Sequence, residues 1–249
     1  MEKLDNLIAD LRSPSQRLIR ISFGTNTAIT PIPVQQITLE SISPYFKRAL
    51  DENGFNVGIN GSLNLPEDEF DVWKVILYWA FKHDLPGPHQ AKNLHLAVRC
   101  WIVGDKYEIK RFQDCVMLRM LRRLDSMHFA LELLGTDVLL LVLKHAPRKS
   151  LLQELVLDWV AVKMHKHNIG SFEEVLLDVA AEPFEDSVTT LETLDGTGFY
   201  PAMLAKRPWL NYGNELMWRP SNCNHDEPSW TNFFLDSSSM FDCTCDGCE

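Results

Sequence analysis

Three residues whose side chains can carry acid–base chemistry follow one another at the end of an apolar helical run. In the segment LHLAVRCWIVGDKYEIKRFQDCV the apolar pattern reaches Gly104 and is followed by Asp105, Lys106 and Tyr107. A carboxylate, an ammonium group and a phenol so close together could transfer protons, given a pocket and suitable partners. The sequence shows neither, and Asp105 and Glu108 have the spacing of a capping box. We therefore predict a joint between two helices, with Gly104 ending the first and Asp105 starting the second.

The C-terminal tail holds a second candidate for chemistry, a set of metal-ligand residue types at close spacing. Cys223 and His225 are two residues apart, and Cys243, Cys245 and Cys248 form a Cys-x-Cys-x-x-Cys pattern. Thiolates and imidazole suit zinc, and four of them would close a tetrahedral site. The residues between the two groups are acidic and offer little to hold a fold around an ion. We therefore expect a disordered tail with incidental thiols. A small zinc-binding regulatory protein that uses this Cys/His tail is the alternative.

The same tail carries three aromatic residues, Trp230, Phe233 and Phe234, within five positions. Aromatic residues in an acidic segment are also typical of a short linear motif that docks on a partner. Elsewhere, His165 and His167 flank a lysine, and residues two apart do not share a helix face. No phosphate-binding loop, nucleophile elbow or zinc-protease motif occurs in the sequence. We expect no catalytic residue, no cofactor and no metal site, and we predict that the protein is not an enzyme.

Charge and hydropathy exclude several classes of protein. The chain has 249 residues and a formal net charge of −10, which argues against nucleic-acid binding because that needs a basic face. The beginning, MEKLDNLIADLRSPS, has charges throughout and lacks the apolar core of a secretory signal. The most apolar run, residues 138–143, is too short to span a bilayer. We expect an intracellular protein, in the cytoplasm or the nucleus, that binds neither nucleic acid nor membrane.

Alternating apolar and polar residues, interrupted by prolines, predict a small sheet in the first half of the chain. In LIRISFG, the apolar residues Ile19, Ile21 and Phe23 alternate with polar ones, which predicts a half-buried strand. Pro31 and Pro33 restrict the segment that follows to an edge strand or a broken strand. A further short strand is expected around SLNL, residues 62–65.

Helices are predicted to cover this sheet. In SPYFKRAL, Ser43 can cap a helix whose first residue is Pro44. An acidic helix start in LPEDEF precedes a helix that is apolar on two faces, one of them formed by Phe70, Trp73, Leu77 and Phe81. Four large side chains on these apolar stripes should be buried together: Phe46, Trp73, Leu77 and Trp101.

Taken in order, these segments resemble the BTB/POZ domain, in the form common in fungal proteins. The matching stretches are IRISFG, ITLESISPYFKRAL, FNVGINGSLNLPEDEFDVWKVILYWAF and LHLAVRCWIVGDKYEIKRFQDCV, the last around the family's Ala-Asp-Lys-Tyr signature with Gly104 in place of alanine. The sequence departs from the family where an Asp before the first strand and a His before the first core helix are usual. Those places hold Leu18 and Gln35 or Gln36, so we expect the buried Asp–His relation of many relatives to be absent here.

The resemblance implies recognition by packing and not catalysis. BTB domains typically homodimerise, and some attach a substrate-recruiting protein to a cullin ubiquitin ligase or to a transcriptional complex. Longer forms carry an N-terminal amphipathic helix that packs across the dimer. The stripe Leu4, Leu7, Ile8 and Leu11 occupies that place here and is our candidate dimer interface. A helix that folds back on its own domain is the alternative, since an apolar face must be covered.

The second half is predicted to be mainly helical, and it shows no kelch, zinc-finger or ankyrin period. We therefore expect an α+β protein, in which a BTB/POZ-like domain, a small sheet covered by helices, is followed by a helical segment and an irregular acidic tail. The expected segments are an amphipathic helix and linker (1–17), the BTB/POZ-like domain (18–124), a helical C-terminal segment (125–212) and the Cys-containing tail (213–249).

Protein purified without added metal is expected to contain no stoichiometric zinc, because a structural ion would make folding of the tail depend on metal. Elemental analysis by mass spectrometry measures this directly. One equivalent of zinc that is lost on Cys245→Ser, and kept on Cys115→Ser outside the tail, would reverse the prediction.

Overall fold

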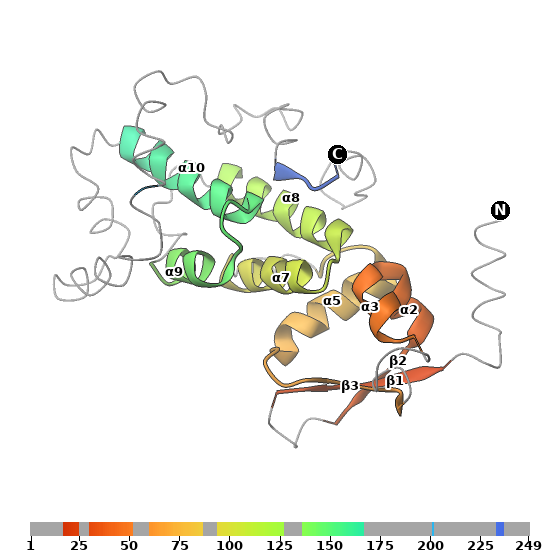
Figure 1. Ribbon diagram of the computed structural model, residues 1–249. Helices are drawn as coiled ribbons and strands as arrows, with labels where there is room; N and C mark the ends of the chain where they lie inside the picture. The colour runs from red at the N-terminus through yellow and green to blue at the C-terminus, as the bar shows by residue number, and fades with distance from the viewer. Residues whose placement is uncertain are drawn as a thin grey trace, which may run out of the picture. The chain divides into compact units, whose positions relative to one another are not determined.

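The computed structural model describes residues 17–24, 30–51, 60–86, 94–126, 136–166, 201 and 233–236. In those residues the chain forms one three-stranded sheet and seven helices (Figure 1). The predicted α+β class is confirmed. The candidate dimer residues Leu4, Leu7, Ile8 and Leu11 lie outside the described residues, so their part in an interface remains a prediction.

The described residues divide into two compact units. The first comprises those within Met1–Pro86 and Val103–Phe112, and the second those within Gly87–Ile102 and Gln113–Glu249. Helix α7 (Leu94–Lys106) and helix α8 (Lys110–Ser126) each contribute residues to both units. The sheet belongs entirely to the first unit, which also holds the candidate site.

The sheet has the strand order β2-β1-β3, so β1 (Leu18–Phe23) is its central strand. Its residues alternate between exposed and buried as predicted, with Ile19, Ile21 and Phe23 in the core. Strand β2 (Ile32–Gln35) pairs with β1 in antiparallel fashion, and β3 (Ser62–Leu65) pairs with it in parallel. Pro33 lies in β2, at the sheet edge, where a residue without an N–H donor is tolerated. The expected edge strand is therefore confirmed.

Helices α2 (Gln36–Ile42), α3 (Pro44–Ala49) and α5 (Phe70–Lys82) lie on one side of this sheet (Figure 1). The predicted start of α3 is confirmed, because Ser43 Oγ accepts a hydrogen bond from the Phe46 N–H at 3.3 Å and Pro44 opens the helix. The cap fixes the entry of α3, and Phe46 is fully buried as a result.

Helix α5 supplies most of the core of the first unit. Its buried residues are Val72, Trp73, Val75, Ile76, Leu77, Trp79 and Ala80. The predicted stripe holds through Leu77 but not into the last turn, where Phe81 is 58% exposed. The spacing of apolar residues alone does not show at which turn a helix stops packing against other elements. Phe46, Trp73, Leu77 and Trp101 are each buried, as predicted. Trp101 belongs to the second unit and the other three to the first, so the packing of all four together remains a prediction.

The joint between α7 and α8 differs from the predicted one. Helix α7 runs through Gly104 and Asp105 and ends at Lys106, and α8 begins only at Lys110. The Ile109 N–H bonds to the Gly104 carbonyl at 2.8 Å, the Glu108 N–H bonds to the Asp105 carbonyl at 3.1 Å, and Glu108 has a φ of 55°. These two bonds define a Schellman C-cap, which holds a helix end with one left-handed residue. The predicted capping box is therefore wrong, because the two acidic residues close α7 and do not start α8.

The second unit contains the described parts of the predicted helical segment. Helices α9 (Thr136–His145) and α10 (Leu151–Lys166) pack against each other. Nearly every side chain from Leu152 to Val160 is buried, so this part of α10 is covered on all sides. Within the predicted tail the structure describes residues 233–236, and Phe233 and Phe234 there are buried. The cysteines of the tail lie outside the described residues, and their predicted lack of a metal remains a prediction.

Trp73→Ala is expected to lower the free energy of unfolding by about 3–5 kcal/mol, because it removes a large side chain from a fully enclosed position. Chemical denaturation measures the change. Phe81→Ala, on the exposed last turn of the same helix, is the matched control and should cost less than about 0.5–1 kcal/mol. A loss below about 1 kcal/mol for Trp73→Ala would place the indole at the surface and contradict the packing.

Candidate functional site

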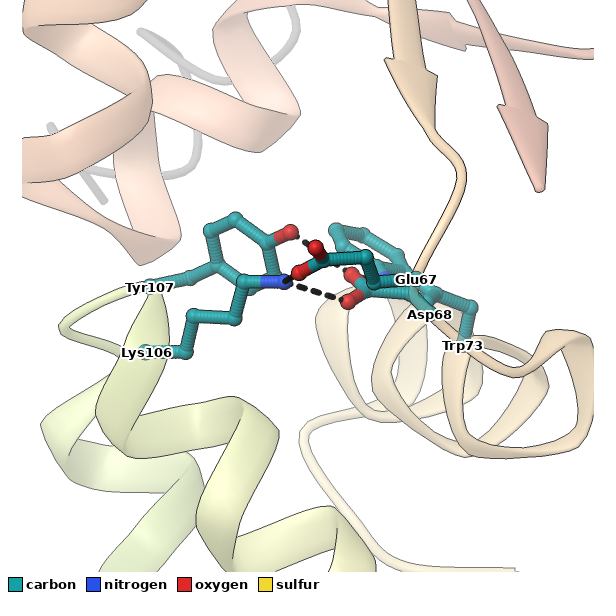
Figure 2. Close-up of polar contacts among 5 residues, drawn as sticks. All are labelled: Glu67, Asp68, Trp73, Lys106 and Tyr107. Carbon is teal, nitrogen blue, oxygen red and sulfur yellow. Dashed lines mark hydrogen bonds and ion pairs between the residues drawn. The ribbon is translucent and has the colours of Figure 1, made fainter. Parts of the chain in front are cut away.

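The carboxylate of Asp68 is buried and collects three hydrogen-bond donors. Tyr107 donates its hydroxyl to Asp68 Oδ2 at 2.6 Å, and Trp73 donates its indole N–H to the same oxygen at 2.9 Å. The ammonium group of Lys106 donates to Oδ1 at 2.7 Å. Figure 2 shows these side chains converging on the one carboxylate. We call Asp68, Trp73, Lys106 and Tyr107 the Asp68 cluster.

Each member of the Asp68 cluster stands at or near the end of an element. Asp68 lies in the turn between β3 and α5, and its backbone N–H bonds to the Leu65 carbonyl at 3.2 Å. Trp73 is in the first turns of α5, Lys106 is the last residue of α7, and Tyr107 follows it. The cluster therefore ties the β3–α5 turn to the C-terminal end of α7.

Tyr107 is held as a protonated donor. Burial raises its pKa well above the ordinary range, and the hydrogen bond to Asp68 and the charge of that carboxylate raise it further. A phenol that acts as a base or nucleophile needs a lowered pKa instead. The Asp68 cluster is therefore suited to holding two elements together, and it is poorly suited to moving protons.

Aromatic side chains enclose the Tyr107 ring. It stacks on Phe46 with a centroid distance of 5.3 Å and meets the edges of Trp73 and Tyr45 at 5.5 and 5.2 Å. Ser43, which caps α3, also donates its hydroxyl to the Tyr107 carbonyl. Side chain and backbone of Tyr107 are thus both fixed, so the end of α7 is anchored to α3 as well as to α5.

The outer side of the cluster faces solvent through Lys106, whose side chain is 43% exposed while that of Asp68 is only 3% exposed. The Lys106 Nζ also lies 3.7 Å from Glu67 Oε2 and 5.2 Å from the centre of the Tyr107 ring. A cation over a buried carboxylate offsets part of the cost of burying that charge. Nearby, Arg48 and Glu108 pair at 2.7 Å, but both side chains are exposed, so this pair adds little to stability.

The sequence analysis identified Lys106 and Tyr107 as a group but missed their partner. It assigned Asp68 to an acidic helix start, whereas Asp68 precedes the N-cap residue Glu69 and is 6% exposed. The sequence did hold a signal that could have pointed to Asp68. The Leu-Pro-Glu-Asp turn and the Asp-Lys-Tyr segment are both motifs of the BTB/POZ resemblance. Spacing along the chain does not show that two such segments meet, since they are 38 and 39 residues apart.

The other candidate residues, those of the Cys/His tail, are outside the part of the chain that the structure describes. Cys223, His225, Cys243, Cys245 and Cys248 all lie outside it, and within it no group of His, Cys, Asp and Glu side chains is placed to hold a metal ion. Among the described helices, none is both long enough and apolar enough to cross a membrane.

The positions where the sequence departs from the BTB pattern are neighbours in the fold. Leu18 opens β1 and is paired with Gln35 at the end of β2. Gln36 starts α2, and its amide donates to Glu40 Oε1 at 2.6 Å and to the Leu50 carbonyl at 3.3 Å. The structure thus places an apolar residue, 56% exposed, opposite an amide side chain at the places where an Asp and a His are usual in the family.

Comparison with known proteins agrees with a BTB-like domain. No family model matches the chain. A BTB/POZ domain-containing protein of Arabidopsis thaliana is 26% identical to it over 156 residues, which is 62% of this chain. The match covers 64% of the plant protein, so the chain spans less than two-thirds of that relative's length. Because this relative is a plant protein, the fungal kind named from the sequence remains a prediction.

Tyr107→Phe is expected to lower the free energy of unfolding by about 1.5–3 kcal/mol, because it removes a buried hydrogen bond to a charged group while keeping the ring. Tyr45→Phe is the matched control. It removes a hydroxyl from the neighbouring ring, which is not part of the Asp68 cluster, and should change stability by less than about 0.5 kcal/mol. Equal effects of the two substitutions in chemical denaturation would contradict the assigned role of Asp68.

Proposed function

We propose that this chain is a non-catalytic protein–protein interaction module of the BTB type, which dimerises and acts as an adaptor for another protein. The observation that carries the proposal is the Asp68 cluster, which joins two motifs of the resemblance, the Leu-Pro-Glu-Asp turn and the Lys-Tyr pair. The α+β fold and the similarity to a BTB/POZ domain-containing protein support it.

The chemistry of the cluster also favours binding over catalysis. The two oxygens of Asp68 are occupied by donors from within the first unit, and Tyr107 retains its proton. A carboxylate and a phenol used in this way fix the geometry of the domain. A surface of fixed shape is what recognition by packing requires.

The partners that we propose are proteins. One is a second copy of this chain, and another is a cullin-type scaffold of a ubiquitin ligase or a transcriptional complex. The net charge of −10 disfavours nucleic acid as a partner. The compartment that we propose is intracellular, the cytoplasm or the nucleus.

The proposed dimer contact is the N-terminal stripe Leu4, Leu7, Ile8 and Leu11. Three turns of helix are not stable alone, so an apolar stripe of this length needs a surface to dock on. Two-fold dimers are the commonest assembly. In the first unit Leu18 is 56% exposed and follows the stripe closely in the sequence. Ile37 is 38% exposed and lies just after the edge strand β2, so both residues provide exposed apolar surface.

Analytical ultracentrifugation of the full chain tests the dimer. The wild type is expected to sediment as a dimer at tens of micromolar, and Leu7→Glu with Leu11→Glu is expected to sediment as a monomer, because the contact would bury two carboxylates. The core should stay folded, as judged by circular dichroism.

The matched control is Asn6→Glu with Ala9→Glu. It introduces the same two charges on the opposite side of the predicted helix and should leave the dimer intact. A wild type that is monomeric at tens of micromolar would contradict the dimer, and the helix would then be a cap on its own domain. Dissociation by both double variants would point to charge repulsion in place of a specific contact.

A further inference from the structure

A short segment near the C-terminal end of the chain is fixed to helix α8 through its backbone. Asp114 of α8 is 2% exposed and accepts two hydrogen bonds, from the Leu235 N–H to Oδ1 at 2.6 Å and from the Asp236 N–H to Oδ2 at 3.1 Å. Both partners belong to the second unit, and Figure 1 shows the segment beside α8. We call residues 233–236 the strap.

The strap uses its side chains in two different ways. Phe233 is fully buried and Phe234 is 8% exposed, so the two rings act as apolar anchors. Leu235 is 42% exposed, so at this position it is the backbone that is recognised, and the Asp236 backbone N–H bonds to Asp114 as well. Buried side-chain anchors combined with backbone hydrogen bonds are features by which protein surfaces bind short peptides.

One carboxylate accepts hydrogen bonds from two successive backbone N–H groups, which fixes the position of the strap along α8. Each oxygen of Asp114 takes one of them, and a charged acceptor makes hydrogen bonds stronger than a neutral one does. Asp114 is buried, so loss of these two hydrogen bonds would carry a cost in free energy. Proline or any N-substituted residue in place of Leu235 would remove the shorter of the two bonds.

We propose that this face of α8 is a peptide-docking site and that the strap is its tethered ligand. The class of ligand is a short peptide with two adjacent aromatic side chains followed by two free backbone N–H groups. The strap fills the site from within the same chain and closes it to other peptides. The aromatic motif seen in the sequence thus binds to a site in its own chain. This inference does not depend on the proposed BTB function.

The test is binding of a fluorescent peptide with the sequence of residues 229–238, SWTNFFLDSS, to the full chain, measured by fluorescence anisotropy. Wild type should bind it weakly, because the tethered strap has a high local concentration. Phe233→Ala with Phe234→Ala should release the strap and raise the affinity for the free peptide by about 10-fold or more. Leu235→Ala, which changes an exposed side chain and keeps the backbone donor, should leave the site closed.

A chemical variant of the peptide tests the role of Asp114 without altering the protein. Methylation of the Leu235 nitrogen removes the donor to Oδ1 and should weaken binding to the released chain by about 10-fold or more. A peptide with both phenylalanines replaced by alanine should not bind. Asp114→Asn in the released chain should lower the affinity for the unmodified peptide to a similar extent.

Three results would overturn the proposal. They are failure of the released chain to bind the peptide, equal binding of the N-methylated peptide, and equal binding of the alanine peptide. A wild type whose site opens on dilution from micromolar to nanomolar concentration would show that the occupant comes from a second copy, which also contradicts a strap within one chain.

Discussion

The hydrogen bonding of the buried Asp68 carboxylate is the interaction on which the first unit depends. A buried charge is costly unless it is paired and hydrogen-bonded, and this one is bonded to a phenol, an indole and an ammonium group. The donors come from α5 and from the end of α7, so satisfying one side chain fixes two elements against the β3–α5 turn. The same requirement makes Tyr107 poorly suited to proton transfer, because its raised pKa keeps it a donor to the carboxylate.

The end of α7 is held in two further ways that act together with the Asp68 cluster. The Schellman cap satisfies the last carbonyls of the helix and turns the chain at Glu108. Ser43 bonds both to the Tyr107 carbonyl and to the N–H of Phe46, so one hydroxyl links the start of α3 to the end of α7. The Asp68 cluster, the Schellman cap and the Ser43 hydrogen bond therefore fix the position of Tyr107 together. The aromatic rings fill the space around it.

Local structure in this protein could be predicted from local sequence. Alternation gave the strand at Leu18–Phe23, Pro33 indicated the sheet edge, and Ser43 with Pro44 marked the start of α3. Two errors had different causes. The spacing of Asp105 and Glu108 fits a capping box, but the same local residues form a C-cap, and spacing alone does not distinguish the two. Asp68 was assigned to a helix start because two of its three partners, Lys106 and Tyr107, are 38 and 39 residues away. The docking of residues 233–236 on Asp114 spans more than a hundred residues, so the local aromatic pattern indicated a docking segment but not the residue on which it docks.

The central claim is that Asp68 and Tyr107 act as one unit, and a double-mutant cycle measures this most directly. Asp68→Asn, Tyr107→Phe and the double variant are compared with wild type by chemical denaturation. If the two groups are coupled as described, the cost of the double variant falls short of the sum of the single costs by about 1–3 kcal/mol. Costs that add to within about 0.3–0.5 kcal/mol would show that the two side chains contribute independently and would contradict the account.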